Sequence, residues 1–241
     1  MSNSNQSPVL VPWSPEKGND TALICIPWAG AGAVPFRAWA PVIGDTADVY
    51  GVRLAGRENR QVEPPATALE DVVAELVSAL TALGVPRVAL FGHCSGALSA
   101  FEAARALRRS EAAPELVHLL VASQLPPQVF AGAPLVSDGD LTRYVPEDLR
   151  SEPELLDLLV PILTADMKLV ANYAYATDAP LDVPLTVAYG ARDEQLGRSE
   201  VDGWRLESTG PVTFHETAGA DHLFSGAAWL DLAEAVRAAL G

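Results

Sequence analysis

Short apolar runs alternate along the chain with stretches in which apolar residues recur at helical spacing. The runs predict strands at 22–26, 49–54, 87–91, 117–122, 185–189 and 212–216. The stretches predict helices at 68–83, 96–107 and 227–240, and Gly84 and Pro86 end the first of these. Short apolar strands separated by helices are typical of a mostly parallel sheet that helices cover on both faces.

The alternation stops between Gln124 and Asp182, where no strand is predicted. A loop opens this region, and an apolar helix at 154–173 follows it, with Pro161 inside. Doubly wound sheets bind ligands at the carboxyl ends of their strands, so we expect a helical lid over that edge, inserted at about 124–180. The alternative is an insertion that only packs against the body. We expect one domain at 21–241, preceded by a flexible segment at 1–20.

The most informative segment is 87–98, RVALFGHCSGAL, in which an apolar strand passes through GHCSG directly into a helix. This is the frame of the nucleophile elbow, a sharp turn that lifts its central side chain above the sheet. Its two glycines are needed because neighbouring backbone leaves no room for a Cβ. A frame centred on Ser95 would lack both glycines, so we predict Cys94 as the nucleophile. A buried structural cysteine beside a glycine-rich turn is the alternative.

Only four histidines are available as the general base. His93 lies inside the elbow, and His118 and His215 lie in predicted strands, where a structural role is expected. His222 follows the last predicted strand in the loop AGADHLF, just before the final helix. We therefore predict His222 as the base.

The orienting acid is expected on a loop between the nucleophile and the histidine. Asp193 follows the strand at 185–189 and precedes His222 by about 30 residues. Glu194 is the alternative if the loop is displaced by one residue, and Asp221 is expected to be solvated. The order nucleophile, acid, histidine predicts an α/β-hydrolase fold: a mostly parallel sheet flanked by helices, with the lid after the strand at 117–122.

Composition narrows the function further. The net charge of −15 argues against nucleic acid and against an anionic membrane surface as partners. Apolar runs stay well short of a membrane span, the start of the chain is unlike a signal peptide, and two cysteines give no disulfide framework. We expect a cytoplasmic protein with an inert, buried Cys25. No metal cluster or nucleotide loop is recognisable, so no cofactor is expected.

Several segments resemble the stand-alone (type II) thioesterases of polyketide and nonribosomal peptide pathways. The segment 23–32, LICIPWAGAG, is similar to the family's strand that ends in Pro-His-Ala-Gly-Gly-Gly, with Trp28 in place of histidine. Phe36 and Trp39 fit the family's next aromatic motif, and 54–60, LAGRENR, matches Leu-Pro-Gly-Arg-Glu-x-Arg with one change. The likeness continues through the elbow and the loops of the predicted acid and base.

The resemblance implies a site and a substrate. The backbone N–H groups of Ala29 and Ser95 would form the oxyanion hole, and we expect Trp28 and His93 to contact the substrate. That substrate would be an acyl thioester on the phosphopantetheine arm of an acyl or peptidyl carrier protein, with the lid gating its entry. The chain departs from the family in its cysteine nucleophile and in a lid that looks shorter between Pro134 and Glu154.

A cysteine nucleophile implies a thioester acyl-enzyme, which reacts readily with amines as well as with water. We expect a thioesterase, with an acyltransferase or cyclase that uses an amine or an internal nucleophile as the alternative. A non-catalytic carrier-protein or acyl-binding protein is the second alternative, and a general esterase or lipase the third. Two interpretations of four arginines are open: they form a basic patch that docks an acidic carrier protein, or they have ordinary structural roles. These residues are Arg37, Arg53, Arg57 and Arg60.

Overall fold

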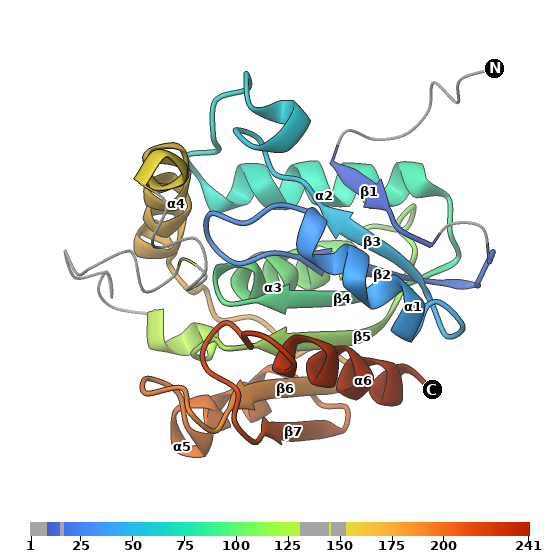
Figure 1. The fold of residues 1–241 in the computed structure, drawn as a ribbon. Coiled ribbons are helices and arrows are strands. Elements are labelled where there is room, and N and C mark those ends of the chain that lie inside the picture. The colour runs from blue at the N-terminus through green and yellow to red at the C-terminus, as the bar shows by residue number, and fades with distance from the viewer. Residues whose placement is uncertain (1–8, 15–16, 131–144, 146–152) are drawn as a thin grey trace.

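A mostly parallel, seven-stranded sheet organises the molecule, as the computed structural model shows (Figure 1). The structure describes residues 9–14, 17–130, 145 and 153–241. The strands are β1 (Leu10–Pro12), β2 (Thr21–Ile26), β3 (Asp48–Val52), β4 (Arg87–His93), β5 (Glu115–Ala122), β6 (Leu185–Gly190) and β7 (Val212–Thr217). Their order is β1-β3-β2-β4-β5-β6-β7, and only β1 runs antiparallel to its neighbour.

Helices cover both faces of this sheet. Helices α2 (Leu69–Leu83) and α3 (Ser95–Arg108) pack on one face, where Ile24, Leu90 and Val121 point. The opposite face, with Leu23 and Phe91, is covered by η1 (Val34–Trp39), α1 (Ala40–Ile43) and α6 (Ala228–Leu240). Alternate residues of each strand therefore enter two separate cores, as the alternation of side chains across a pleated strand requires. The parallel sheet covered on both faces, as predicted, is confirmed.

The six strands and three helices predicted in the body are all present, with ends that differ from the predicted ones by at most two residues. The strand β1 is the exception, because residues 1–20 are predicted to form a flexible segment. That prediction is wrong for Leu10–Pro12, which pairs with Val52–Tyr50, and Val9 and Leu10 are buried. Three residues are too few for a periodic signal, so pairing with β3 and not local pattern determines this strand.

Helix α4 (Pro153–Asn172) lies beyond the carboxyl ends of the strands, at the position expected for the lid (Figure 1). It continues through Pro161. The predicted shortening of the lid between Pro134 and Glu154 falls almost entirely outside the described residues. The shorter elements are η2 (Glu58–Arg60), η3 (Pro127–Phe130), α5 (Arg198–Val201) and η6 (Asp202–Glu207).

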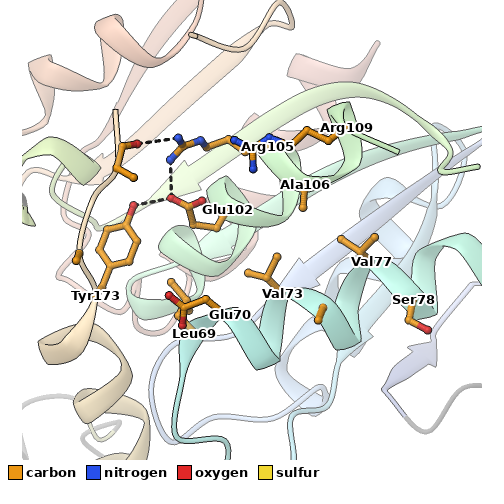
Figure 2. A pocket seen from close by; sticks show the side chains of 13 residues that line it. Leu69, Glu70, Val73, Val77, Ser78, Glu102, Arg105, Ala106, Arg109 and Tyr173 are labelled. Atoms are coloured by element: carbon orange, nitrogen blue, oxygen red, sulfur yellow. Dashed lines mark hydrogen bonds and ion pairs between the residues drawn. The ribbon is translucent and has the colours of Figure 1, made fainter. Parts of the chain in front are cut away.

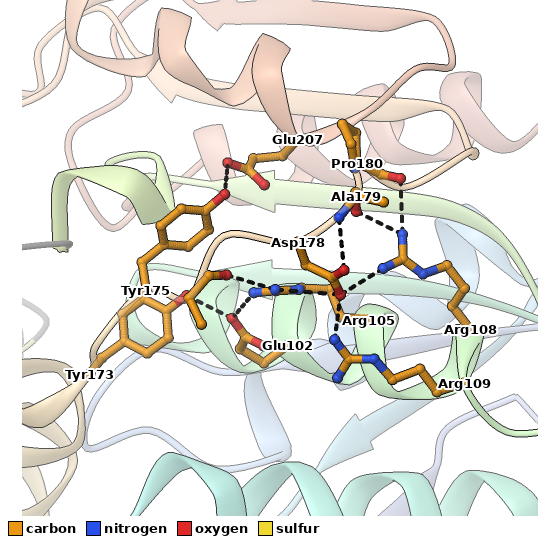
Figure 3. A network of polar contacts seen from close by, with 11 residues as sticks. Glu102, Arg105, Arg108, Arg109, Tyr173, Tyr175, Asp178, Ala179, Pro180 and Glu207 are labelled. Carbon is orange, nitrogen blue, oxygen red and sulfur yellow. Dashed lines mark hydrogen bonds and ion pairs between the residues drawn. The ribbon is translucent and has the colours of Figure 1, made fainter.

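The chain that leaves α4 is fastened to α3 by a polar network (Figure 3). Asp178 accepts hydrogen bonds from Arg108 and Arg109, and Arg105 donates to the carbonyl of Ala176 at 2.7 Å. Tyr173 donates to Glu102 at 2.7 Å, and Glu102 is also paired with Arg105. The lid helix is therefore anchored to the body at its carboxyl end.

A groove of about 650 Å³ lies between α2, α3 and the start of that segment (Figure 2). Val73 and Val77 of α2 line one side, and Glu102, Arg105 and Tyr173 line the other. It is lined by none of the predicted catalytic residues.

Candidate active site

The turn between β4 and α3 has the geometry of a nucleophile elbow. Cys94 connects the two elements with φ 51° and ψ −121°, a left-handed backbone conformation that costs free energy for a residue with a Cβ. A Cβ at Gly92 would lie 2.3 Å from the carbonyl oxygen of Gly96, and one at Gly96 would lie 2.4 Å from that of Pro27. Both glycines are therefore required by close backbone approach, as predicted.

Neighbouring strands hold the strained turn in place. The N–H of Cys94 donates to the carbonyl of Ala122 at 2.8 Å, at the end of β5. The side-chain amide of Gln124 donates to the carbonyl of Cys94 at 2.9 Å. Cys94 itself is buried, with 6% of the residue exposed.

The structure brings Cys94, His222 and Asp193 together. Nε2 of His222 lies 3.3 Å from Sγ of Cys94, and Nδ1 donates to Oδ2 of Asp193 at 2.7 Å. The side chain of Asp193 is 1% exposed and that of His222 is 18% exposed. The three groups thus form a hydrogen-bonded chain with the geometry of a nucleophile, base and orienting acid.

The charge around His222 favours its protonated form. Burial lowers the pKa of the imidazole, but the negative charge of the Cys94 sulfur and the hydrogen bond and charge of Asp193 outweigh it, and raise the pKa of His222 to about 10. A protonated imidazole beside a sulfur stabilises the thiolate, which is the nucleophilic form of cysteine.

Of the two backbone groups predicted for an oxyanion hole, one belongs to the elbow and the other follows β2, the strand paired with β4. Ser95 is the first residue of α3, so its N–H has no acceptor within the helix. Ala29 follows β2, is 2% exposed, and packs against Leu163 and Met167 of α4. The roles of both N–H groups remain predictions.

His93 does not contact the substrate space, contrary to our prediction. It is fully buried, and its ring contacts those of Trp28, Trp229 and Phe224 at centroid distances of 5.3, 5.8 and 5.8 Å. Its Nε2 lies 2.9 Å from the carbonyl oxygen of His222, to which it must donate. Burial lowers the pKa of His93 to about 3, so the ring is neutral. Its position in the chain beside Cys94 gave no indication that its side chain points into the core.

Trp28, the other predicted substrate contact, packs against Cys94 and Leu223 and is 8% exposed. It borders the nucleophile, and its contact with a substrate remains a prediction. Asp221, expected to be solvated, is half-buried and accepts the N–H groups of Leu223 and Ser225 through one carboxylate oxygen. Asp221 thereby stabilises the turn that carries the histidine.

The other candidate residues take no part in the hydrogen bonds that join Cys94, His222 and Asp193. Glu194 is exposed, whereas Asp193 makes the contact with His222. His118 is buried in β5 with its Nε2 2.9 Å from the hydroxyl of Thr186, and His215 lies in β7. Cys25 is fully buried in β2, and burial raises the pKa of its thiol.

Of the two interpretations of the four arginines, the basic patch does not form. Arg53 pairs with Glu58, and Arg60 pairs with Glu63 and Glu75. Arg57 is 5% exposed and pairs with Asp166 of α4, so of the four arginines only Arg37 is exposed. The structural alternative is the correct one, because each of these pairs neutralises a charge that docking would need.

Sequence reasoning assigned no role to Asp166, which lies in the lid helix α4. This carboxylate accepts the N–H of Gly30 at 2.8 Å, next to the predicted oxyanion residue Ala29. One signal was available, since an aspartate between Leu163 and Met167 interrupts the apolar face of a helix. Its partner Arg57 lies 109 residues away and could not be inferred from spacing.

No group of three or more histidine, cysteine or acidic side chains that would suit a metal ion occurs among the described residues. Within the same part of the chain, no helix is long and apolar enough to cross a membrane.

A mostly parallel sheet, a strained elbow with two obligatory glycines, and an acid and a histidine on the loops after β6 and β7 define the α/β-hydrolase class. The chain belongs to the thioesterase domain family, whose model matches residues 21–239.

Individual relatives support this assignment. The chain is 32% identical over 215 residues to the gramicidin S biosynthesis protein GrsT of Aneurinibacillus migulanus, across 84% of this chain and 82% of that one. RedJ, a thioesterase from the prodiginine biosynthetic pathway in Streptomyces coelicolor, superposes with a TM-score of 0.81 at 29% identity, across 92% and 86% of the two chains. BorB, a type II thioesterase from the borrelidin biosynthetic cluster, gives a TM-score of 0.82 at 26% identity, across 99% and 98%.

Proposed function

We propose that this protein is a thioesterase that releases acyl groups held as phosphopantetheine thioesters on acyl or peptidyl carrier proteins, in polyketide or nonribosomal peptide biosynthesis. The observation that carries the catalytic part is the 3.3 Å contact between Nε2 of His222 and Sγ of Cys94 in the elbow. The substrate class is supported by the similarity to GrsT, RedJ and BorB.

In the first half-reaction Cys94 is the nucleophile. Its thiolate attacks the carbonyl carbon of the substrate thioester, and the N–H groups of Ala29 and Ser95 stabilise the oxyanion that forms. Collapse of this intermediate breaks the bond to the pantetheine sulfur, which leaves with the proton that His222 carried. The product is an acyl-enzyme in which a thioester to Cys94 has replaced the thioester to the carrier.

In the second half-reaction neutral His222 is the general base. It takes a proton from water, and the oxygen attacks the acyl carbon. The thiolate of Cys94 then leaves, which releases a carboxylic acid and restores the pair of thiolate and imidazolium. Asp193 holds the imidazole in the required tautomer throughout.

An acyltransferase or cyclase is the second candidate, and the cysteine itself favours it. A serine would store the acyl group as an oxygen ester, whereas Cys94 would keep it as a thioester, which amines attack readily. In that reaction an amine takes the place of water, and the product is an amide.

Intact-protein mass spectrometry after incubation with a short acyl-pantetheine thioester tests the nucleophile. We expect an acyl adduct on the wild type and on Cys25→Ala. Ser95→Ala should also form it, because this substitution removes the hydroxyl and keeps the backbone N–H. Cys94→Ala should form none. An adduct that persists on Cys94→Ala, or disappears in Ser95→Ala alone, would assign the nucleophile elsewhere.

The fate of the adduct separates the two candidate reactions. Two rates are compared: the loss of the adduct in water, and the formation of amide when an amine is added. A faster loss in water supports hydrolysis, and a faster formation of amide supports transfer. The absence of both adduct and turnover with any thioester would favour a protein that only binds carriers or acyl groups.

A further inference from the structure

A buried ion pair joins the lid helix α4 to the loop beside the site. Arg57 donates to both oxygens of Asp166, from Nη1 to Oδ2 at 2.8 Å and from Nη2 to Oδ1 at 2.7 Å. Their side chains are only 5% and 6% exposed. Such a forked pair has a well-defined geometry because both partners are planar.

The two charged groups also bind the backbone of one tight turn. Asp166 Oδ2 accepts the N–H of Gly30 at 2.8 Å, and Arg57 Nη1 donates to the carbonyl of Ala31, also at 2.8 Å. The turn is closed by the N–H of Ala31, which donates to the carbonyl of Trp28 at 3.0 Å. Gly30 has φ +82°, a conformation that glycine adopts without strain.

These bonds determine where the N–H of Ala29 points. That N–H belongs to the same planar, trans peptide as the carbonyl of Trp28, so the two groups point in opposite directions. Fixing the Trp28 carbonyl through the turn therefore fixes the direction of the Ala29 N–H. Leu163 and Met167 pack against Ala29 from the same helix that carries Asp166.

We propose that Asp166 and Arg57 are positioning residues, which aim the Ala29 N–H at the oxyanion of the acyl-transfer step. The proposal rests on the function proposed above. Because Asp166 belongs to α4, the oxyanion hole is correctly formed only while that helix is seated on the turn. Buried ion pairs contribute little net stability compared with apolar residues of similar volume, so aiming a backbone donor is a better account of this one than stability.

The test compares two reactions of the same sulfur. Acylation by an acyl-pantetheine thioester passes through an oxyanion, whereas alkylation by iodoacetamide needs the thiolate but no oxyanion hole. For Asp166→Ala we expect single-turnover acylation to fall by about 10²-fold, with the alkylation rate within about 3-fold of the wild type. Asp166→Asn and Arg57→Lys, which keep part of the hydrogen bonding, should give intermediate losses.

A double variant protects the test against misfolding. Arg57→Leu with Asp166→Leu removes both charges, so it leaves neither one buried alone. It should keep a cooperative thermal transition and show the same selective loss of acylation. The control is His118→Gln, which changes another buried polar side chain, one that hydrogen-bonds to Thr186 of β6 and takes no part in the turn or in the anchoring of α4. In this control the ratio of the acylation rate to the alkylation rate should not change.

The outcomes separate this proposal from the function on which it rests. A lowered ratio in the Asp166 variants and the double variant, with His118→Gln unchanged, supports positioning. An unchanged ratio in folded Asp166→Ala, or an equal fall of both rates, overturns the positioning role and leaves the thioesterase function standing. A wild type that is alkylated at Cys94 but never acylated refutes the proposed function, and the positioning role with it.

Discussion

The two histidines His93 and His222 lie close together, with ring centroids 6.5 Å apart, and yet their protonation is opposite. Both are largely buried, which by itself lowers the pKa of an imidazole. The pKa of His93 falls to about 3, and that of His222 rises to about 10. The difference comes from their partners, since His222 faces the sulfur of Cys94 and the carboxylate of Asp193, whereas His93 faces aromatic rings.

The comparison shows that burial favours the neutral form of an imidazole, but that nearby negative charges can outweigh this effect. For His222 a nearby negative charge decides which form prevails. His93 uses its neutral ring for a different purpose, because its Nε2–H donates to the carbonyl of His222 and holds the backbone of the base. In the proposed mechanism His222 exchanges protons, and His93 supports its backbone.

Removing the carboxylate of Asp193 should have the largest effect of the changes that distinguish His222 from His93. In Asp193→Asn the imidazole of His222 loses its charged acceptor and its preferred tautomer, and we expect kcat for thioester turnover to fall by about 10³–10⁴-fold. Steady-state kinetics with an acyl-pantetheine substrate measures the loss. Glu194→Gln is the control, since that side chain is exposed, and it should retain wild-type turnover. A greater loss in Glu194→Gln would identify Glu194 as the acid.

Removing the sulfur should bring the two histidines closer in pKa. In Cys94→Ala the imidazolium of His222 loses the negative charge beside Nε2, and its pKa should fall by about 1–3 units. The pKa of His93 should stay low, because its burial is unchanged. NMR titration of the two ring Cε1–H signals, in wild type and variant, measures both. An unchanged pKa for His222 would show that Asp193 alone sustains it.

Replacing the supporting histidine should have a smaller effect, visible in stability. His93→Phe keeps a ring among the aromatic neighbours but leaves the buried carbonyl of His222 without this donor, at a cost of about 1–3 kcal/mol in the free energy of unfolding. Urea unfolding above about pH 7.5, where His93 is neutral in both folded and unfolded states, measures that cost.

The pH dependence of unfolding gives a second readout for the same variant. The unfolded chain takes up a proton on His93 below pH about 6.5, whereas the native chain does not until pH about 3. The wild type therefore loses up to about 1.4 kcal/mol per pH unit from this group as the pH falls between those values. His93→Phe lacks this contribution, so its stability should fall less steeply. Equal slopes in the two proteins would contradict a neutral, buried His93.

The sheet and the grouping of Cys94, Asp193 and His222 were predictable from sequence because both depend on short-range signals. Apolar runs identify the strands, and the glycines of the elbow identify a turn in which backbone approach excludes a Cβ. Parallel strands place the loops that follow them at one edge of the sheet, so a carboxylate after β6 and a histidine after β7 meet there.

What sequence could not supply is the direction of individual side chains and their distant partners. His93 follows an apolar strand and precedes the nucleophile whether it faces a substrate or the core, and the neighbours that decide this include Trp229 from α6. Arg57 was equally compatible with a surface patch and with a buried pair, because its partner Asp166 arrives from the lid helix. Strand β1 forms by pairing with β3, and no local pattern in the sequence indicates that pairing.

The spacing of the reactive pair has a consequence for the newly synthesised chain. His222 follows Cys94 by 128 residues, so at about 5–20 residues per second the cysteine is translated roughly 6–25 s before its base. During that interval the β5 edge of the sheet is also without β6 and β7, which deliver the acid and the histidine. On the proposed mechanism, Cys94 therefore has neither its base nor its acid beside it until β6, β7 and the loops that follow them have been translated and have joined the sheet.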